Sequence, residues 1–249
     1  MRRWRFVSPV AALALWQALA GAGLLGKTPS PASVIAGMYE LIVTGLPPGY
    51  GLFGHLAASL ERVLAGFGVA LVLAIPIGIL MGWSPAFDTV MDPLVELVRP
   101  VPPLAWLPLA ITWFGIGIFS AAFLIFLGSF FPIVLNTVTG VKSVDPCLVE
   151  AARTLGARRK TILARVLVPG SLPSIITGLR IGIGIGWMTV IAAEMTGVKS
   201  GYGLGYMIMT ARDVANYSYV VAGMVVIGLV GFLMDRIIRT FEKRLLRWR

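Results

Sequence analysis

The chain has 249 residues, of which 57% are hydrophobic and 13% are charged, and its mean hydropathy is +0.88. Soluble domains are about 45–50% apolar and about 25% charged, so this composition excludes both a soluble enzyme and a disordered chain. The 21 Lys and Arg outnumber the 11 Asp and Glu, but they flank apolar stretches, where topology signals lie, and we expect no nucleic-acid partner. A single Cys and a single His argue against an internal disulfide, a zinc site and a His-based catalytic triad.

The charges leave long apolar stretches between them, and a spanning helix needs about 20 such residues. Basic residues concentrate in residues 2–5, 142–165 and 236–249, and short basic loops stay in the cytoplasm. Both termini and the loop 142–168 are therefore predicted to be cytoplasmic, which requires an even number of spans on each side of the loop. We expect an all-α membrane protein of one domain, 1–249, with six transmembrane helices. Their predicted ranges are 6–25, 57–82, 92–112, 118–141, 169–194 and 215–237.

The first predicted helix, 6–25, also fits a signal peptide, and we expect it to be retained as a membrane helix. Residues 21–28 match the P-loop pattern G-x-x-x-x-G-K-[ST], whose mechanism requires a preceding strand and a following helix. An apolar helix precedes the match and prolines follow it, so we interpret it as a chance match and expect no cofactor in this chain. Ser30-Pro31 then predicts the start of a short amphipathic helix on the outer membrane surface.

Prolines interrupt the third predicted helix, whose start is predicted at Asp92-Pro93. Four prolines between residues 99 and 108 predict a departure from regular helix. Inside a bilayer such a break persists where protein or a water-filled cavity covers it. Pro102, Pro103 and Trp106 are therefore candidates for a pathway or gate, and a kinked packing helix is the alternative.

The loop 142–168 has its own predicted helices. Asp145-Pro146 predicts a helix start, and Gly156 is placed to end that helix in a left-handed conformation. A second helix is predicted over 157–167, before Pro169. The loop is thus either a docking element or only a solvated basic topology signal.

The residue pattern separates these two interpretations. The segment 150–169 resembles the EAA motif of binding-protein-dependent ABC importer permeases, EAA-x3-G-x9-I-x-L-P. It begins with Glu150-Ala151-Ala152, has Gly156 after three further residues and ends at 166–169 after nine more, with valine at the Ile and Leu positions. Residues 99–109, 113–115, 193–194 and 200–205 resemble the subgroup for nitrate, sulfonates, taurine and bicarbonate.

The resemblance implies that the loop couples to an ATP-binding subunit through Glu150, Ala151, Ala152, Arg153, Gly156 and Arg158. It also implies that the fifth helix lines the pathway, which adds Gly182, Gly186, Thr189 and Glu194 as candidates. Gly178, Gly182 and Gly186 recur every four residues, a spacing that allows close helix packing within one subunit or between two. Glu194 is a costly intramembrane charge, for which a structural salt bridge is the alternative.

The implied partners are a second copy of the chain, two ATP-binding subunits that hold ATP and Mg, an extracytoplasmic solute-binding protein and the lipid bilayer. The expected location is a bacterial or archaeal cytoplasmic membrane. The chain itself would perform no covalent chemistry. An ion-coupled secondary transporter is the alternative, but it should carry acidic residues deep within its helices, and 63–87, 100–141 and 214–234 contain none. A membrane enzyme should show a His or Asp cluster, which the single His55 disfavours.

Overall fold

The computed structural model describes residues 4–196 and 202–245, with side chains from residue 8 onward. Outside this part lie Arg2, Arg3, the side chain of Arg5, Ser200, Gly201, Arg247 and Arg249, on which some of the topology and motif predictions rest.

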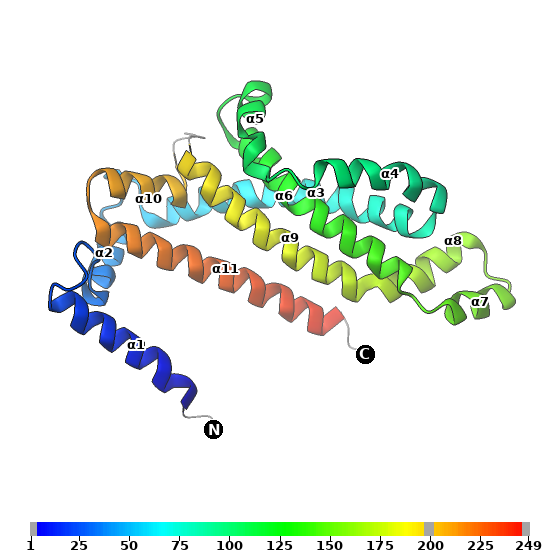
Figure 1. The fold of residues 1–249 in the computed structure, drawn as a ribbon, viewed down its shortest axis with the longest axis horizontal. Coiled ribbons are helices and arrows are strands. Elements are labelled where there is room, and N and C mark those ends of the chain that lie inside the picture. Colours follow the sequence, from blue (N-terminus) through cyan, green and yellow to red (C-terminus); the bar gives the residue numbers. More distant parts are fainter. Residues whose placement is uncertain (1–3, 197–201, 246–249) are drawn as a thin grey trace. The chain divides into compact units, whose positions relative to one another are not determined.

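The described residues form helices joined by turns and short loops, with no strand among them, as Figure 1 shows, which confirms the all-α prediction. Its helices are α1 (Trp4–Gly21), α2 (Pro31–Val43), α3 (Leu52–Trp83), α4 (Pro85–Val98), α5 (Leu107–Phe114), α6 (Ile118–Lys142), α7 (Pro146–Thr154), α8 (Arg159–Ile162), α9 (Val168–Thr196), α10 (Leu204–Asp213) and α11 (Tyr217–Leu245). A 3₁₀ turn over Pro103–Trp106 precedes α5, and a π turn over Leu163–Leu167 joins α8 to α9.

Four runs of helix in the described residues are long and apolar enough to cross a membrane: α3, α6, Arg159–Thr196 and α11. The bent pair of α4 and α5 makes a fifth if it is counted as one span. The described part of α1, Ser8–Gly21, is shorter. The prediction of six spans therefore stays a prediction.

By its contacts the chain forms two compact units, 1–59 with 201–230 and 60–200 with 231–249. In the first unit, the predicted start of α2 is confirmed, because the Ser30 Oγ accepts a hydrogen bond from the Ser33 amide at 3.2 Å. The segment that matches the P-loop pattern follows a helix, α1, and not a strand.

The first unit also contains α10, which the sequence analysis did not predict. His55 and Ser59, both buried on α3, hold the start of this helix. The Gly203 amide donates to His55 Nδ1 at 3.1 Å, and the Leu204 amide donates to Ser59 Oγ at 2.9 Å. Because Nδ1 accepts, the His55 Nε2–H donates to the Leu46 carbonyl, 2.8 Å away, so both ring nitrogens are used structurally.

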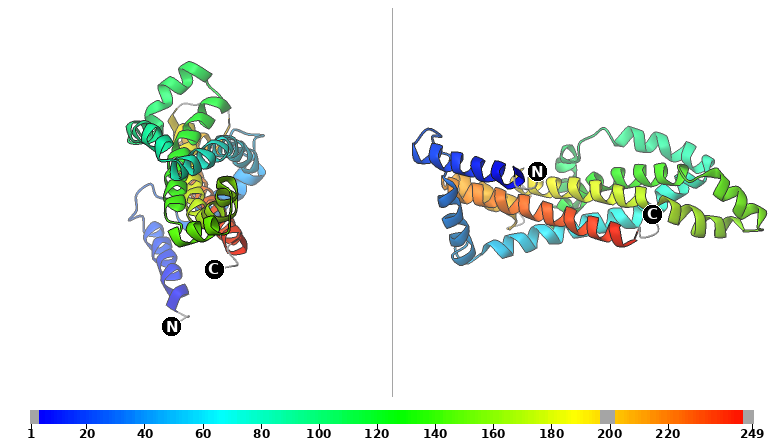
Figure 2. Two further views of the ribbon diagram at one scale, coloured as in Figure 1. Left: turned by 90° about the vertical axis from the view of Figure 1, so that its right-hand side faces the viewer. Right: turned by 90° about the horizontal axis from the view of Figure 1, so that it is seen from below.

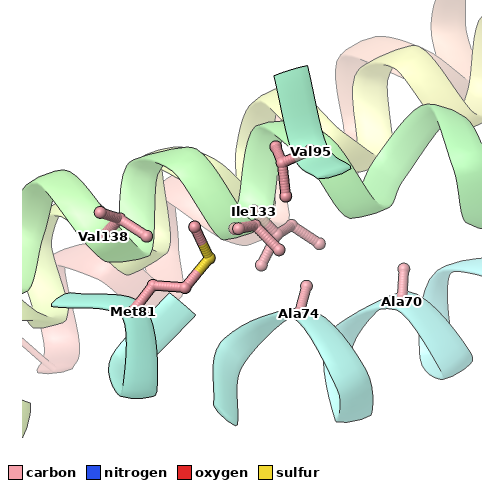
Figure 3. Close-up of a cluster of buried hydrophobic side chains, with 7 residues drawn as sticks. Ala70, Ala74, Met81, Val95, Ile133 and Val138 are labelled. Carbon is pink, nitrogen blue, oxygen red and sulfur yellow. The ribbon is translucent and has the colours of Figure 1, made fainter. Parts of the chain in front are cut away.

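The core of the second unit lies where α3, α4 and α6 meet. Ala70, Ala74 and Met81 of α3 pack against Val95 of α4 and against the α6 side chains Ile133, Val134 and Val138, as Figure 3 shows. Small residues let α3 approach α6 closely: a Cβ added at Gly66 would lie 2.4 Å from the Ala122 carbonyl oxygen.

The predicted boundaries of the third helix are wrong. Helix α4 begins at Pro85, where Ser84 is the N-cap, and Pro93 lies inside α4 instead of at its start. Ser84-Pro85 is the same combination of capping residue and first-turn proline as Asp92-Pro93, and the earlier one forms the start. The span is also not continuous, because α4 and the segment Pro103–Phe114 meet at 83°.

The predicted break between residues 99 and 108 is confirmed: helix is lost at 99–102 and resumes through the 3₁₀ turn. Helix α9 begins at Val168, one residue before the predicted start, and the run of helix that contains it extends back through the π turn to Arg159. Pro169 does not interrupt it, because the π turn widens the helix just before the proline ring would meet the Arg165 carbonyl.

Candidate functional site

The loop between α6 and α9 is a folded helix–Gly–helix unit. Asp145 caps α7 by accepting a hydrogen bond from the Cys147 amide at 2.9 Å. At the other end the Gly156 amide donates to the Arg153 carbonyl and the Ala157 amide to the Ala152 carbonyl, which is the hydrogen-bond pattern of a Schellman motif. Gly156 has φ = 78°, as its predicted left-handed role requires.

A small core supports this loop. Val141, Ile162 and Leu167 are buried there, and Ala152 and Ala157 pack against them. In Figures 1 and 2, α7 and α8 extend beyond one end of the α6–α9 pair. The loop is therefore attached to the end of α6 by apolar contacts.

The EAA residues point in two directions from α7. Ala152 is half-buried against the small core, whereas Glu150, Ala151, Arg153, Gly156 and Arg158 are exposed. The exposed face also carries Leu148 and Leu155, whose exposed fractions are 57% and 87%. These two leucines were not among the predicted coupling residues. Their spacing of seven residues in a short helix was the signal for a common apolar face.

The glycine stripe of α9 packs against α6 of the same chain. Gly178, Gly182 and Gly186 are buried there, and the added Cβ of Gly178 would lie 3.1 Å from the Pro132 carbonyl oxygen. Ser129 Oγ donates to the Gly182 carbonyl at 3.0 Å. Of the two arrangements left open by the sequence, the structure shows packing within the subunit.

Glu194 is paired with an arginine of α3. Its Oε1 lies 2.7 Å from Arg62 Nη1, and the exposed fractions of the two side chains are 1% and 6%. Two ionised groups removed from solvent need such a partner, because an isolated buried charge is strongly disfavoured. The salt bridge that was the alternative for Glu194 is therefore present.

The proline break borders a cavity of about 370 Å³ in the second unit. Arg99, Val101 and Pro103 line it from the break, and α9 contributes Ile181 and Ile185. The lining residues of α6 are Leu127, Gly128, Phe131, Pro132, Leu135 and Asn136. Figure 1 shows that the chain changes direction between α4 and α5 at this point. Its lining is apolar except for Arg99 and Asn136.

The structure does not gather all the predicted pathway residues at this cavity. Pro103 lines it, and Thr189 is buried beside the lining residue Gly128, where an added Cβ would be 3.1 Å from Thr189 Oγ1. Trp106 instead packs against the separate cluster around Ala110, and Pro102 is exposed. Arg99, which lines the cavity, was not among the predicted pathway residues, although its position directly before the prolines was a usable signal.

Comparison with known proteins identifies the family of the chain. Residues 74–247 match the model of the binding-protein-dependent transport system inner membrane component. A putative ABC transporter permease of Methanocaldococcus jannaschii is 44% identical over 246 residues, which cover 97% of this chain and 90% of that protein. The taurine transport system permease protein TauC of Escherichia coli is 41% identical over 241 residues, covering 95% and 86%. The nitrate import permease protein NrtB of Synechocystis is 36% identical over 236 residues, covering 92% and 84%.

Solved structures agree on the fold. An inward-facing form of the MetNI methionine ABC transporter aligns with a TM-score of 0.60 at 20% identity, covering 82% of this chain and 97% of that chain. An amino acid ABC transporter aligns with a TM-score of 0.61 at 18% identity, covering 79% and 93%. The chain belongs to the binding-protein-dependent transport system inner membrane components, the permease family of ABC transporters.

Proposed function

We propose that the chain is the permease subunit of an ATP-driven importer for a small anion of the nitrate, sulfonate, taurine or bicarbonate class. The exposed apolar face of the α7 loop carries the proposal. A short, capped helix that exposes Leu148 and Leu155 has a face that a partner would cover. The relatives named for taurine and nitrate transport support the anion class.

In this proposal the whole chain, 1–249, is one permease domain with six spans, the sixth being α1, in the cytoplasmic membrane. Both termini and the α7 loop face the cytoplasm. Two copies form the path, and two ATP-binding subunits, which hold ATP and Mg, dock on the α7 loops through Glu150, Ala151, Ala152, Arg153, Gly156 and Arg158. A solute-binding protein delivers the solute from the other side. ATP-driven closure of the ATPase pair shifts the balance between two states of the path.

An ion-coupled transporter would need ionisable acids free to exchange protons or sodium within its helices. In the described residues the one buried carboxylate is Glu194, and it forms an ion pair with Arg62. This arrangement favours the ATP-driven mechanism.

Purification of the tagged chain from cells that also express its genomic partner ATPase tests the proposal. We expect a stable complex, and ATP-dependent uptake of labelled taurine or nitrate by vesicles that contain it with the binding protein. A chain that purifies without an ATPase and transports under an ion gradient alone would contradict the proposal.

The native Cys147 allows the topology to be tested without a mutation, because it is exposed in the loop. A membrane-impermeant maleimide should label it in inside-out vesicles and not in intact cells. Labelling in intact cells would place the loop outside and reject the topology.

A further inference from the structure

We propose that Arg99 is the anion-binding residue of the permeation path, and that the cavity beside the proline break holds the anionic group of the solute. The inference rests on the proposed function for the identity of the path. It goes beyond it by assigning one side chain and one cavity to charge selection.

The position of the cavity is the first argument. Its α6 residues, 127–136, lie in the middle of Ile118–Lys142, and its α9 residues, Ile181 and Ile185, lie in the middle of Val168–Thr196. Two helices that cross a bilayer carry their middle residues near its midplane. The cavity therefore lies at the depth where a transported solute is farthest from the water on either side of the membrane.

The charge of Arg99 is the second argument. Apart from the loop 142–168, residues 60–196 contain three arginines. Arg62 pairs with Glu194, and Arg180 pairs with Asp235 of α11. Arg99 alone has no ion-pair partner among the described residues, and it is exposed at the cavity. An unpaired cation at membrane depth is costly unless it faces water or binds an anion.

The backbone at the break is the third argument. Pro100, Pro102 and Pro103 lack amide donors, and the segment 99–102 is not helical. Irregular backbone at membrane depth is stable where it borders a water-filled cavity. When an oxyanion leaves bulk solvent it loses hydrogen-bond donors, and water together with a guanidinium, which has five N–H donors, can replace them.

The neighbouring residues favour a small anion. The remaining lining is apolar except for Asn136, whose Nδ2 donates to the Pro132 carbonyl at 2.8 Å. No carboxylate lines the cavity. The site therefore has one positive charge and no opposing negative charge, which disfavours cations relative to solutes that carry an anionic group.

Thiol labelling tests the charge of the cavity directly. Ile181, which has an exposed fraction of 44%, is replaced by Cys in a Cys147→Ser background, and the full-length chain is placed in nanodiscs with and without its ATPase. The probes are two methanethiosulfonates of similar size, one carrying a sulfonate and the other a trimethylammonium group. The sulfonate reagent should react faster by about tenfold, because a localised charge raises the local concentration of counter-ions.

Substitution of Arg99 separates the inference from alternatives. Arg99→Gln should abolish the tenfold preference, Arg99→Lys should retain most of it, and taurine or nitrate should slow the reaction only when a cation is present at position 99. The matched control is Cys147 in the otherwise native chain, whose ratio of rates should not change with Arg99→Gln. Equal rates for both reagents, or a preference that survives Arg99→Gln, would overturn the inference.

The labelling is measured on the permease chain and does not need ATP hydrolysis, so its failure is distinct from failure of the proposed function. If vesicles transport labelled taurine or nitrate with ATP while Arg99→Gln leaves the labelling ratio unchanged, the importer assignment stands and the role of Arg99 is rejected. If the preference is present and no ATPase binds, the cavity assignment stands and the coupling proposal is rejected.

Discussion

The hydroxyl of Ser129 on α6 donates a hydrogen bond to the carbonyl oxygen of Gly182 on α9, at 3.0 Å. So short a side chain reaches a neighbouring backbone only where two helices are almost in contact. The absence of a side chain at residue 182 permits that approach, because an added Cβ would lie 3.0 Å from the Ser129 carbonyl oxygen. The α6–α9 contact therefore depends on small volume at a few positions.

Gly178→Ala should weaken this contact. The added Cβ would lie 2.8 Å from Asn136 Cβ and 3.1 Å from the Pro132 carbonyl oxygen, and neither backbone can move freely within a packed pair. We expect a loss of about 1–3 kcal/mol in the free energy of unfolding, as for other overpacked interiors. Thermal unfolding in detergent measures it. Gly184→Ala is the control on the same helix, because no atom lies within 4 Å of its added Cβ; equal losses in both variants would contradict the packing model.

Removing one partner of the Arg62–Glu194 ion pair should lower the stability of the chain more than replacing both partners. Glu194→Gln leaves the Arg62 charge buried without its partner, and we expect a loss of about 3–5 kcal/mol in the free energy of unfolding. The double variant Arg62→Met/Glu194→Leu should recover most of that loss. Stability assays and uptake assays on both variants are needed, since a stable double variant without uptake would show that Glu194 also acts in the path.

Gly156 should tolerate Asn and reject Val. Its φ of 78° disfavours side chains by about 1–2 kcal/mol, with Asn among the exceptions, while the surrounding space is open. Gly156→Val should therefore shift the end of α7 and reduce co-purification of the ATPase, whereas Gly156→Asn should not. Comparable loss of the complex in both variants would mean that contact volume, and not backbone conformation, matters at this position.

The adjacent residues Ala151 and Ala152 should respond differently to the same change. Ala152→Leu adds volume against the core around Ile162 and should lower the stability of the chain by about 1–3 kcal/mol. Ala151→Leu adds volume on the exposed face, so the stability of the isolated chain should not change while binding of the ATPase weakens. Unfolding curves and pull-down assays on the same two samples distinguish these effects. Unchanged ATPase binding in Ala151→Leu would remove that face from the interface.

Local chemistry could be predicted from the sequence where the determinants are adjacent in the chain. The local signals are Ser30 and Asp145, which cap helices that begin at the following proline, and Gly156, which ends a helix through its own left-handed conformation. The structure confirms each of these roles. The departure from helix between 99 and 108 was equally predictable, because proline removes the backbone donor itself.

Features that depend on distant residues could not be predicted in this way. Helix α10 begins where His55 and Ser59 accept its first amides, and those residues are more than 140 positions away in the sequence. The partner of Glu194 lies on α3, 132 residues earlier. The cavity beside Arg99 exists only because three elements meet there, so residue types alone indicated the break but not the space next to it.

The unbroken helix from Arg159 to Thr196 has a mechanical consequence. It joins the α7 loop to the glycine contact with α6 through 38 residues of helix, with no flexible loop between them. In Figure 1 α8 and α9 meet at an angle, at the π turn Leu163–Leu167, which is where a helix bends most readily. A displacement of the loop would therefore reach Gly182 through continuous helix, and the π turn is the point at which its direction would change.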